Sequence, residues 1–540
     1  MAKMKFEKFG VMVDMSRNSV MTVDALKRFM DALAKMGYNC LFLYTEDTYE
    51  VDGEPYFGYL RGRYSKDEMK EIDAYGESLG IEVIPCIQTL AHIATFMRWS
   101  KVPGDTPDIL LVGDERTYEL IDHMFATLSE CFKTRRLHIG MDEAHMLGKG
   151  LYLERHGYED PNVIIKKHLD RIKEIAAKYG YDLMLWSDMF FRPWTNNCYY
   201  TKRTEVPKEY VDALPEGIIP VYWDYYHTDF EMYDGMMYNH KQFDKNFWFA
   251  GGAWTWTGYM PQNGFTLTTM LPALEAARKN KTKNVFFTMW GDDGGECSRF
   301  AVLPSLFYLS EIAKGNTDEA AVKAKFEAKY GIPFDDFMLL DLPGTPNGAA
   351  DHICNAEKYL LFNDCLLGIM DQQIYEGEGA QFAACAKVLD KMVGHPQWGY
   401  LFATQQALCH ALEIKAELSV RTRKIYHSGE KAALPALIAD YGEAADRVRA
   451  FLKIYRKQWF RDNKPHGFDV QDIRLGGVIT RLESARDRLQ ALYDGEIQKI
   501  EELDEVQLDF NGEGNALREP TTWQPQWHWI TTPNVVANML

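Results

Sequence analysis

The chain has 540 residues, of which 46% are apolar, and 60 basic against 78 acidic side chains give it a formal net charge of −18. This length exceeds one ordinary domain, and the acidic balance argues against a nucleic-acid partner, since a polyanion would be repelled. No apolar run approaches the roughly 20 residues of a membrane-spanning helix, so we expect no membrane association.

The first ten residues are charged and lack the apolar stretch of a secretory signal, which predicts a cytoplasmic protein. The nine cysteines are odd in number and include no Cys-x-x-Cys pair. They therefore fit neither a disulfide framework nor a zinc ribbon.

Up to about residue 315, a short apolar or β-branched run alternates eight times with an amphipathic helical pattern. Val23–Met36 is one such helix, and Ser65–Leu79 begins with a capping box formed by Ser65 and Glu68. The predicted strands are Gly10–Asp14, Asn39–Tyr44, Ile81–Cys86, Leu137–Gly140, Asp182–Trp186, Ile218–Tyr222, Phe247–Gly251 and Asn284–Met289.

Eight strand-then-helix units predict an α/β fold, a closed (β/α)8 TIM barrel over residues 1–315. An open doubly wound sheet is the alternative. Such a sheet usually carries a glycine-rich phosphate loop after its first strand, whereas Asp14–Asn18 contains no glycine.

After about residue 315 the strand-like runs disappear, which predicts a C-terminal, mainly helical domain over residues 316–506. The tail, residues 507–540, is rich in tryptophan and proline and is expected to pack on the body. The predicted helices are Asn355–Met370, Gln381–Val393, Leu401–His427, Leu434–Asp462 and Val478–Leu503.

Two adjacent carboxylates, Asp142 and Glu143, follow the fourth predicted strand. Active sites of such barrels lie at the C-terminal ends of the strands. Neighbouring carboxyl groups suit chemistry that needs one protonated and one ionised group. The alternative is a pair of solvated loop side chains.

Tryptophans follow the next four strands and are interleaved with acidic residues. Indole faces stack on the apolar face of a pyranose, and carboxylates accept hydrogen bonds from its hydroxyls. This pattern predicts a sugar site, although each tryptophan could instead be a core residue. The tryptophans are Trp186, Trp223, Trp254, Trp256 and Trp290.

The segment His138–Glu143 resembles the His-x-Gly-Gly-Asp-Glu signature of the family 20 β-N-acetylhexosaminidases, with Met141 in place of the second glycine. Further segments are similar to family motifs after other strands, and the resemblance runs in the right order over roughly residues 6–314. These segments are Asp14–Asn18, Thr45–Asp47, Leu90–His92 and Trp290–Asp292.

The resemblance implies an exo-acting, retaining enzyme that removes terminal β-linked GlcNAc or GalNAc. The nucleophile would be the 2-acetamido oxygen of the substrate, which forms an oxazolinium intermediate. Glu143 would be the general acid and then the base, and Asp142 would orient the acetamido N–H.

Further roles also follow from the resemblance. A tyrosine should donate to the acetamido oxygen, and Tyr225, Tyr226 and Tyr259 remain candidates. Many relatives carry an arginine where this chain has Phe9, and Arg17 is a candidate substitute. The expected substrate contacts are Trp186, Trp223, Tyr225, Trp254, Trp256, Trp290, Asp292, Arg17 and His92, and the expected supporting residues are His138 and Asp47.

Two other functions remain open. One is a metal-dependent hydrolase that uses His138, Asp142, Glu143 and His145, whose spacing matches no standard metal motif. The other is a sugar-binding protein without turnover, which would not need a general acid. We expect no cofactor and no metal, a small glycan or glycoconjugate ending in N-acetylhexosamine as the substrate, and a homodimer formed through the helical part.

Overall fold

The computed structural model describes residues 4–345 and 353–536, apart from 511, 513, 515–523 and 525. The chain forms two compact units. The first, here called the barrel unit, comprises Met1–Ala253, Thr266–Trp290 and Ser305–Val322. The second, the helical unit, comprises Trp254–Phe265, Gly291–Pro304 and Lys323–Leu540. The domain boundaries predicted at residues 315 and 506 stay predictions.

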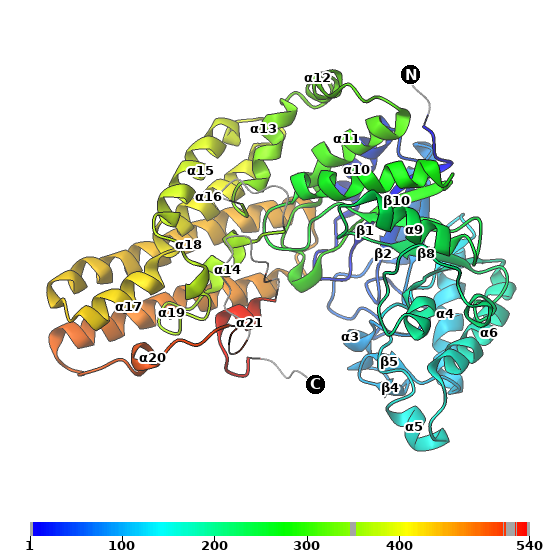
Figure 1. Ribbon diagram of the computed structural model, residues 1–540, viewed down its shortest axis with the longest axis horizontal. Coiled ribbons are helices and arrows are strands. Elements are labelled where there is room, and N and C mark those ends of the chain that lie inside the picture. The colour runs from blue at the N-terminus through cyan, green and yellow to red at the C-terminus, as the bar shows by residue number, and fades with distance from the viewer. Residues whose placement is uncertain are drawn as a thin grey trace. The chain divides into compact units, whose positions relative to one another are not determined.

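Eight parallel strands close into a barrel in the order β1-β10-β9-β8-β7-β6-β3-β2, which confirms the predicted fold (Figure 1). The predicted strands correspond to the observed ones with small shifts at their ends. The strands are β1 Lys8–Asp14, β2 Cys40–Tyr44, β3 Glu82–Cys86, β6 Arg136–His138, β7 Asp182–Trp186, β8 Ile219–Trp223, β9 Trp248–Gly252 and β10 Asn284–Met289.

Helices follow the barrel strands and cover them from outside (Figure 1). The helix predicted at Val23–Met36 and the capping box of Ser65 and Glu68 are both confirmed. The helices up to residue 314 are α1 Val23–Met36, α2 Lys66–Ser78, α3 Ala94–Met97, α4 Glu115–Cys131, α5 Leu151–His156, α6 Pro161–Tyr179, α7 Asp188–Phe191, α8 Lys208–Val211, α9 Phe230–His240, α10 Asn263–Lys279 and α11 Leu303–Lys314.

A small antiparallel sheet of β4 (Gly104–Thr106) and β5 (Ile109–Leu110) was not predicted. Strands of three and two residues are too short to show an alternating hydrophobic pattern.

Large aromatic side chains fill the interior of the barrel. Phe42 stacks on Phe286 with ring centroids 4.3 Å apart and meets Trp248 edge-on at 5.6 Å. All three are essentially inaccessible to solvent. The barrel is therefore packed rather than hollow, as is usual for this fold, and substrate chemistry has to take place at its rim.

Long antiparallel helices build the helical unit, with α15 against α16, α16 against α18, and α18 against α19 (Figure 1). The prediction of Leu434–Asp462 is confirmed. The helices are α12 Glu319–Tyr330, α13 Phe334–Met338, α14 Ala356–Phe362, α15 Glu378–Val393, α16 Gly399–Lys415, α17 Leu418–Ser428, α18 Leu434–Asp462, α19 Phe468–Asp494, α20 Glu501–Asp504 and α21 Trp527–Thr531.

Three predicted helices were wrong in extent. The one expected to reach Met370 ends at Phe362, because Asn363 leaves the helical conformation and its Oδ1 accepts the Met370 N–H at 2.9 Å. The pattern Leu401–His427 is two helices, α16 and α17. The pattern Val478–Leu503 stops at Gly495, whose φ of 81° is left-handed.

All nine cysteines are free, and all but Cys198 are buried. Among the residues that the structure describes, no helix combines the length and the apolar character needed to cross a bilayer.

Candidate active site

The turn after β6 carries the paired carboxylates in an unusual backbone conformation. Gly140, Met141 and Glu143 all have left-handed φ values, of 71°, 72° and 52°, which non-glycine residues rarely adopt. The N–H of Met141 donates to Oε1 of Gln88 at 3.1 Å, and the N–H of Glu143 donates to Oδ2 of Asp188 at 3.2 Å. Side chains beyond the ends of the neighbouring strands β3 and β7 therefore hold this turn.

Asp142 lies in a polar nest at the end of the barrel. Nε2 of Gln88 donates to its Oδ1 at 2.8 Å, and Nε2 of His92 lies 3.3 Å from its Oδ2. Burial alone would raise the pKa of Asp142, but the charge of His92 and these hydrogen bonds outweigh burial and lower it to about 2. Burial likewise opposes protonation of His92, yet Asp142 raises the pKa of His92 to about 10. At neutral pH the two side chains form a charged pair.

Glu143 occupies a different environment from its neighbour. Its side chain is 45% exposed, against 14% for Asp142. Its Oε2 lies 3.6 Å from Nε2 of His92. One carboxylate is thus enclosed and held ionised while the next faces solvent, a division that allows adjacent carboxyl groups to do different work.

A third carboxyl group, Asp188, lies behind the pair and was not among the predicted site residues. It begins α7, is completely buried, and has no hydrogen-bond partner for its Oδ1 among the described residues. Burial, followed by the charge of Asp142, raises the pKa of Asp188 to about 7. Its position two residues beyond a strand end is the only sequence signal that could have found it.

Among the described residues, one group of side chains could hold a metal ion: His92, Asp142 and Glu143, whose ligand atoms lie within 4.8 Å of one another. His138 and His145, which the metal-hydrolase alternative required, are not part of this group. Burial lowers the pKa of His138 to about 3, and its Nδ1 accepts the N–H of Gly140 at 3.1 Å. His138 thus supports the turn as a neutral ring.

Aromatic rings from three strand ends adjoin the carboxylates within the barrel unit. The Trp186 and Trp290 ring centroids lie 6.1 Å apart at 50°, and Tyr44 meets Trp290 edge-on at 4.7 Å. Tyr44 also accepts a hydrogen bond from Gln88, the residue that contacts Asp142. Gln88 thus links Tyr44, which packs on Trp290, to the carboxylate of Asp142.

Tyr225 reaches the same wall. Its hydroxyl hydrogen-bonds with the side chains of Trp290 and Thr288, and its ring stacks on that of Trp223 at 5.5 Å. Of the two other tyrosine candidates, Tyr226 is 39% exposed. Tyr259 belongs to the helical unit, where its hydroxyl donates to Gln471 at 3.2 Å.

Arg17 lies over the rings of Tyr44 and Trp290, with its guanidinium carbon 5.0 and 5.2 Å from their centroids. Asp14 and Glu46 hold the guanidinium at 3.2 and 3.4 Å. Arg17 thus places a cation beside the aromatic wall.

Phe9, which stands where relatives carry an arginine, is a core residue that packs on Tyr38 and Phe287. Asp47 accepts from Nε of Arg61 at 2.9 Å, and Arg61 in turn donates to the carbonyl of Ser16. Asp47 therefore supports the loop that carries Arg17.

Three predicted contacts belong to the helical unit. Trp254 and Trp256, which follow β9 in the chain, are buried and stack with ring centroids 4.1 Å apart. Asp292, two residues after Trp290, is exposed at the start of the short 3₁₀ helix Asp292–Gly294. Their part in a sugar site stays a prediction.

A closed parallel barrel with an Asp-Glu pair and an indole wall at its strand ends is an arrangement typical of a glycoside hydrolase. Two family models match the chain: the catalytic domain of glycosyl hydrolase family 20 over residues 6–206, and the glycoside hydrolase 20C C-terminal domain over residues 335–521. The chain belongs to glycoside hydrolase family 20.

Relatives of known name are distant. Hexosaminidase D of Homo sapiens is 24% identical over 216 residues, which is 38% of this chain and 42% of the relative. A β-hexosaminidase of Emericella nidulans is 24% identical over 253 residues, 40% of this chain and 39% of the relative. The chain thus spans less than half the length of these relatives.

Among solved structures, the GH20 β-N-acetylhexosaminidase of Streptomyces coelicolor A3(2) matches with a TM-score of 0.44 and 19% identity. That match covers 62% of this chain and 70% of the other.

Proposed function

We propose that this protein is an exo-acting, retaining β-N-acetylhexosaminidase that removes terminal β-linked GlcNAc or GalNAc from a small glycan or glycoconjugate. The observation that carries the proposal is the difference in environment between Asp142 and Glu143. Asp142 is enclosed and held ionised by His92 and Gln88, while Glu143 beside it faces solvent. Substrate-assisted hydrolysis needs one fixed anion next to one accessible proton donor.

In the first step the acetamido oxygen of the substrate attacks C1 and forms the oxazolinium ring. The bond from C1 to the glycosidic oxygen breaks, and its electron pair leaves with that oxygen. Glu143, in its protonated form, gives the leaving oxygen a proton. Such general acid catalysis contributes on the order of 10²–10⁴ in rate, and the attack within one molecule requires no protein nucleophile.

In the second step a water molecule attacks C1 from the face that the leaving group vacated. The Glu143 carboxylate takes its proton, and the bond from C1 to the acetamido oxygen breaks. The acetamido group is regenerated, and the sugar is released with its anomeric configuration retained.

Asp142 is proposed to accept the acetamido N–H and to stabilise the positive charge that develops there, as an oriented anion does most effectively in an enclosed site. His92 keeps that carboxylate ionised. Tyr225 is the proposed donor to the acetamido oxygen because its hydroxyl lies at the Trp290 wall. Arg17 is the proposed partner for ring hydroxyls.

The aromatic residues complete the proposed sugar site. Trp186 and Trp290 supply its aromatic walls, together with Trp223. Trp254, Trp256 and Asp292 are proposed as further contacts on the family resemblance alone.

The test is hydrolysis of 4-nitrophenyl N-acetyl-β-glucosaminide, its galacto analogue and the plain β-glucoside by wild type, Glu143→Gln and Asp142→Ala. A thiazoline mimic of the oxazolinium serves as inhibitor. We expect turnover of the acetamido sugars only, lost in both variants and blocked by the thiazoline. Comparable turnover of the plain glucoside would contradict the proposal, and no turnover at all would favour the sugar-binding alternative.

A homodimer and a cytoplasmic location complete the proposal. The support for them is limited to the acidic, amphipathic helical part and the charged first residues. Light scattering on the purified chain tests the first, and fractionation of the source cells tests the second.

A further inference from the structure

The start of α14 in the helical unit buries three polar side chains in almost consecutive positions. Asn355, the residue before the helix, and Glu357 are completely buried, and Lys358 is 1% exposed. A charge inside a protein is strongly destabilising unless it is paired and hydrogen-bonded. The partners of these three residues therefore show what they hold in place.

Lys358 binds the segment that follows β10, residues 291–296. Its Nζ lies 3.0 Å from Oδ2 of Asp293 and 2.7 Å from Oε2 of Glu296. Burial opposes protonation of Lys358, but the two carboxylates outweigh it and raise its pKa, so the lysine stays charged.

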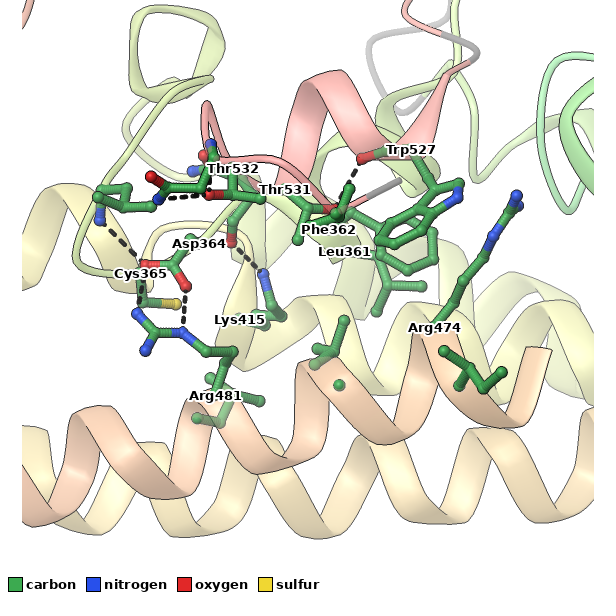
Figure 2. Close-up of a pocket in the computed structure, with 18 of the residues that line it drawn as sticks. Leu361, Phe362, Asp364, Cys365, Lys415, Arg474, Arg481, Trp527, Thr531 and Thr532 are labelled. Atoms are coloured by element: carbon green, nitrogen blue, oxygen red, sulfur yellow. Dashed lines mark hydrogen bonds and ion pairs between the residues drawn. The ribbon is translucent and has the colours of Figure 1, made fainter. Parts of the chain in front are cut away.

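Arg474 of α19 binds the same segment from another helix. It donates to the Asp293 carbonyl at 2.5 Å, and its Nη1 lies 3.2 Å from Oε1 of Glu296. Figure 2 shows Arg474 reaching from α19 past the indole of Trp527, 5.0 Å from the ring centroid. The backbone N–H of Trp527 also donates to Oδ2 of Asp293 at 2.9 Å.

The backbone of this segment has left-handed or extended positive φ values. Asp293, Gly294 and Gly295 have φ values of 38°, 131° and 64°. A Cβ on Gly294 would lie 2.8 Å from Nη1 of Arg474, so a side chain there would have to displace the guanidinium. Of these three, Asp293 is the residue that rarely adopts a positive φ, and ion pairs from Lys358 and Arg474 hold its side chain.

The other two residues of α14 bind the segment that follows β9, residues 254–262. Nδ2 of Asn355 donates to the Thr257 carbonyl at 2.8 Å, and the N–H of Tyr259 donates to Oε1 of Glu357 at 3.1 Å. Gln405 of α16 donates to the Tyr259 carbonyl at 2.7 Å. One short helix thus contacts both segments.

We propose that α14 is a positioning element: Asn355, Glu357 and Lys358, with Arg474, set the conformations of two segments that carry proposed substrate contacts. Residues 254–262 carry Trp254 and Trp256, and residues 291–296 carry Asp292. This inference rests on the proposed function to the extent that these three residues contact the sugar. GlcNAc and GalNAc differ only in the orientation of the hydroxyl at C4. Lys358 and Arg474 hold Asp293 and Glu296, which lie beside Asp292 in the chain, so their loss should change the selectivity between the two sugars if the proposed contact of Asp292 is with that hydroxyl.

The chain provides matched controls. Lys415 is also buried, at 3% exposed, but its Nζ donates to the carbonyls of Leu360 and Asn363 near the far end of α14. Arg481 of α19 pairs with Asp364 at 2.8 Å. Both line a cavity of about 500 Å³ (Figure 2) and hydrogen-bond to neither segment. Replacing them removes a cation, buried at Lys415 and 46% exposed at Arg481, without loss of the segment contacts.

The experiment compares Lys358→Met with Lys415→Met, and Arg474→Met with Arg481→Met, in the full chain. We expect Lys358→Met and Arg474→Met to raise KM and to change the GlcNAc to GalNAc ratio of kcat/KM by about tenfold, the size of one charged hydrogen bond. The two controls should leave that ratio within about twofold. An unchanged ratio in the first pair, or an equal change in the controls, would overturn the inference.

Amide hydrogen exchange gives a second readout that does not depend on activity. Lys358→Met should speed exchange in residues 291–296. Glu357→Leu, which removes the acceptor for the Tyr259 N–H, should act on residues 257–262 instead. Glu357→Gln keeps that acceptor and should restore protection. Equal exchange in all variants and wild type would overturn the positioning role.

The two proposals fail in different ways. Should wild type hydrolyse neither glycoside, the proposed function is wrong, while segment-specific exchange still decides whether α14 holds the segments. Should wild type turn over both sugars with exchange and selectivity unaffected in every variant, only the positioning role is wrong.

Discussion

Replacing Asp188 by asparagine should change the stability of the barrel unit in a pH-dependent way. Asp188 is completely buried, its Oδ2 accepts the Glu143 N–H, and burial with the nearby charge of Asp142 raises its pKa from 3.8 to about 7. Asparagine has nearly the same shape and retains an oxygen acceptor for that N–H. Asparagine does not titrate, so the difference between the two proteins reports the effect of protonating Asp188 on stability.

The sign follows from the raised pKa. Between about pH 4 and pH 7 the folded protein keeps a proton on Asp188 that the unfolded chain releases. The stability linked to this proton is fully present below about pH 4 and is lost as the pH rises through 7. At about 1.36 kcal/mol per pKa unit, a rise of about three units makes the wild type lose up to about 4 kcal/mol relative to Asp188→Asn across this window.

Urea and thermal unfolding of both proteins from pH 4.5 to 8 measure the effect. The stability of Asp188→Asn minus that of wild type should increase by about 2 kcal/mol or more between pH 5 and pH 7. Asp364→Asn should show no such trend in this range, because Arg481 outweighs burial and lowers the pKa of Asp364 below 3.8, so this carboxyl is ionised in both the folded and the unfolded chain. A difference between Asp188→Asn and wild type that stays constant over this range would refute the reasoning.

Three further outcomes are expected. Asp142→Asn should lower the pKa of His92 from about 10 to below 6.5, because the effect of burial on His92 is then largely unopposed. NMR titration of labelled histidine measures this pKa, and a value still near 10 would contradict the charged pair of His92 and Asp142. Zn²⁺ should inhibit competitively, because Nε2 of His92 lies 3.3 and 3.6 Å from the carboxylate oxygens of Asp142 and Glu143, near the spacing of about 3.3 Å between ligands of a tetrahedral zinc ion. The inhibition should strengthen from pH 6 to pH 8, since the metal displaces a proton, and equal inhibition of His92→Gln would exclude this site. Gly140→Ala should lower both the melting temperature and kcat/KM, because its Cβ would lie 2.1 Å from Oε1 of Gln88, and wild-type values for both would show that the turn can relax.

The sequence by itself determined the barrel and the place of its chemistry. Each strand and the helix after it show a periodic spacing of apolar residues over a short stretch of sequence, so the bounds of β7 and β10 were predicted correctly at both ends. For the same reason the acidic pair could be assigned to the end of a strand. The same local reading failed at the ends of several helices, such as α14, where Asn363 leaves the helical conformation. Nothing in the apolar spacing of Leu401–His427 marks the break between α16 and α17.

Only the tertiary structure decided which groups control the acidic pair. Gln88 and Asp188 lie 54 and 45 residues from the positions they contact, Asp142 and Glu143, and they meet them because β3 and β7 flank β6 in the closed sheet. The ion pair between Lys358 and Glu296 likewise joins residues that are 62 positions apart in the sequence. Hydrophobic periodicity carries no information about such pairings, since the energy of a buried charge depends on partners that only the folded chain brings together.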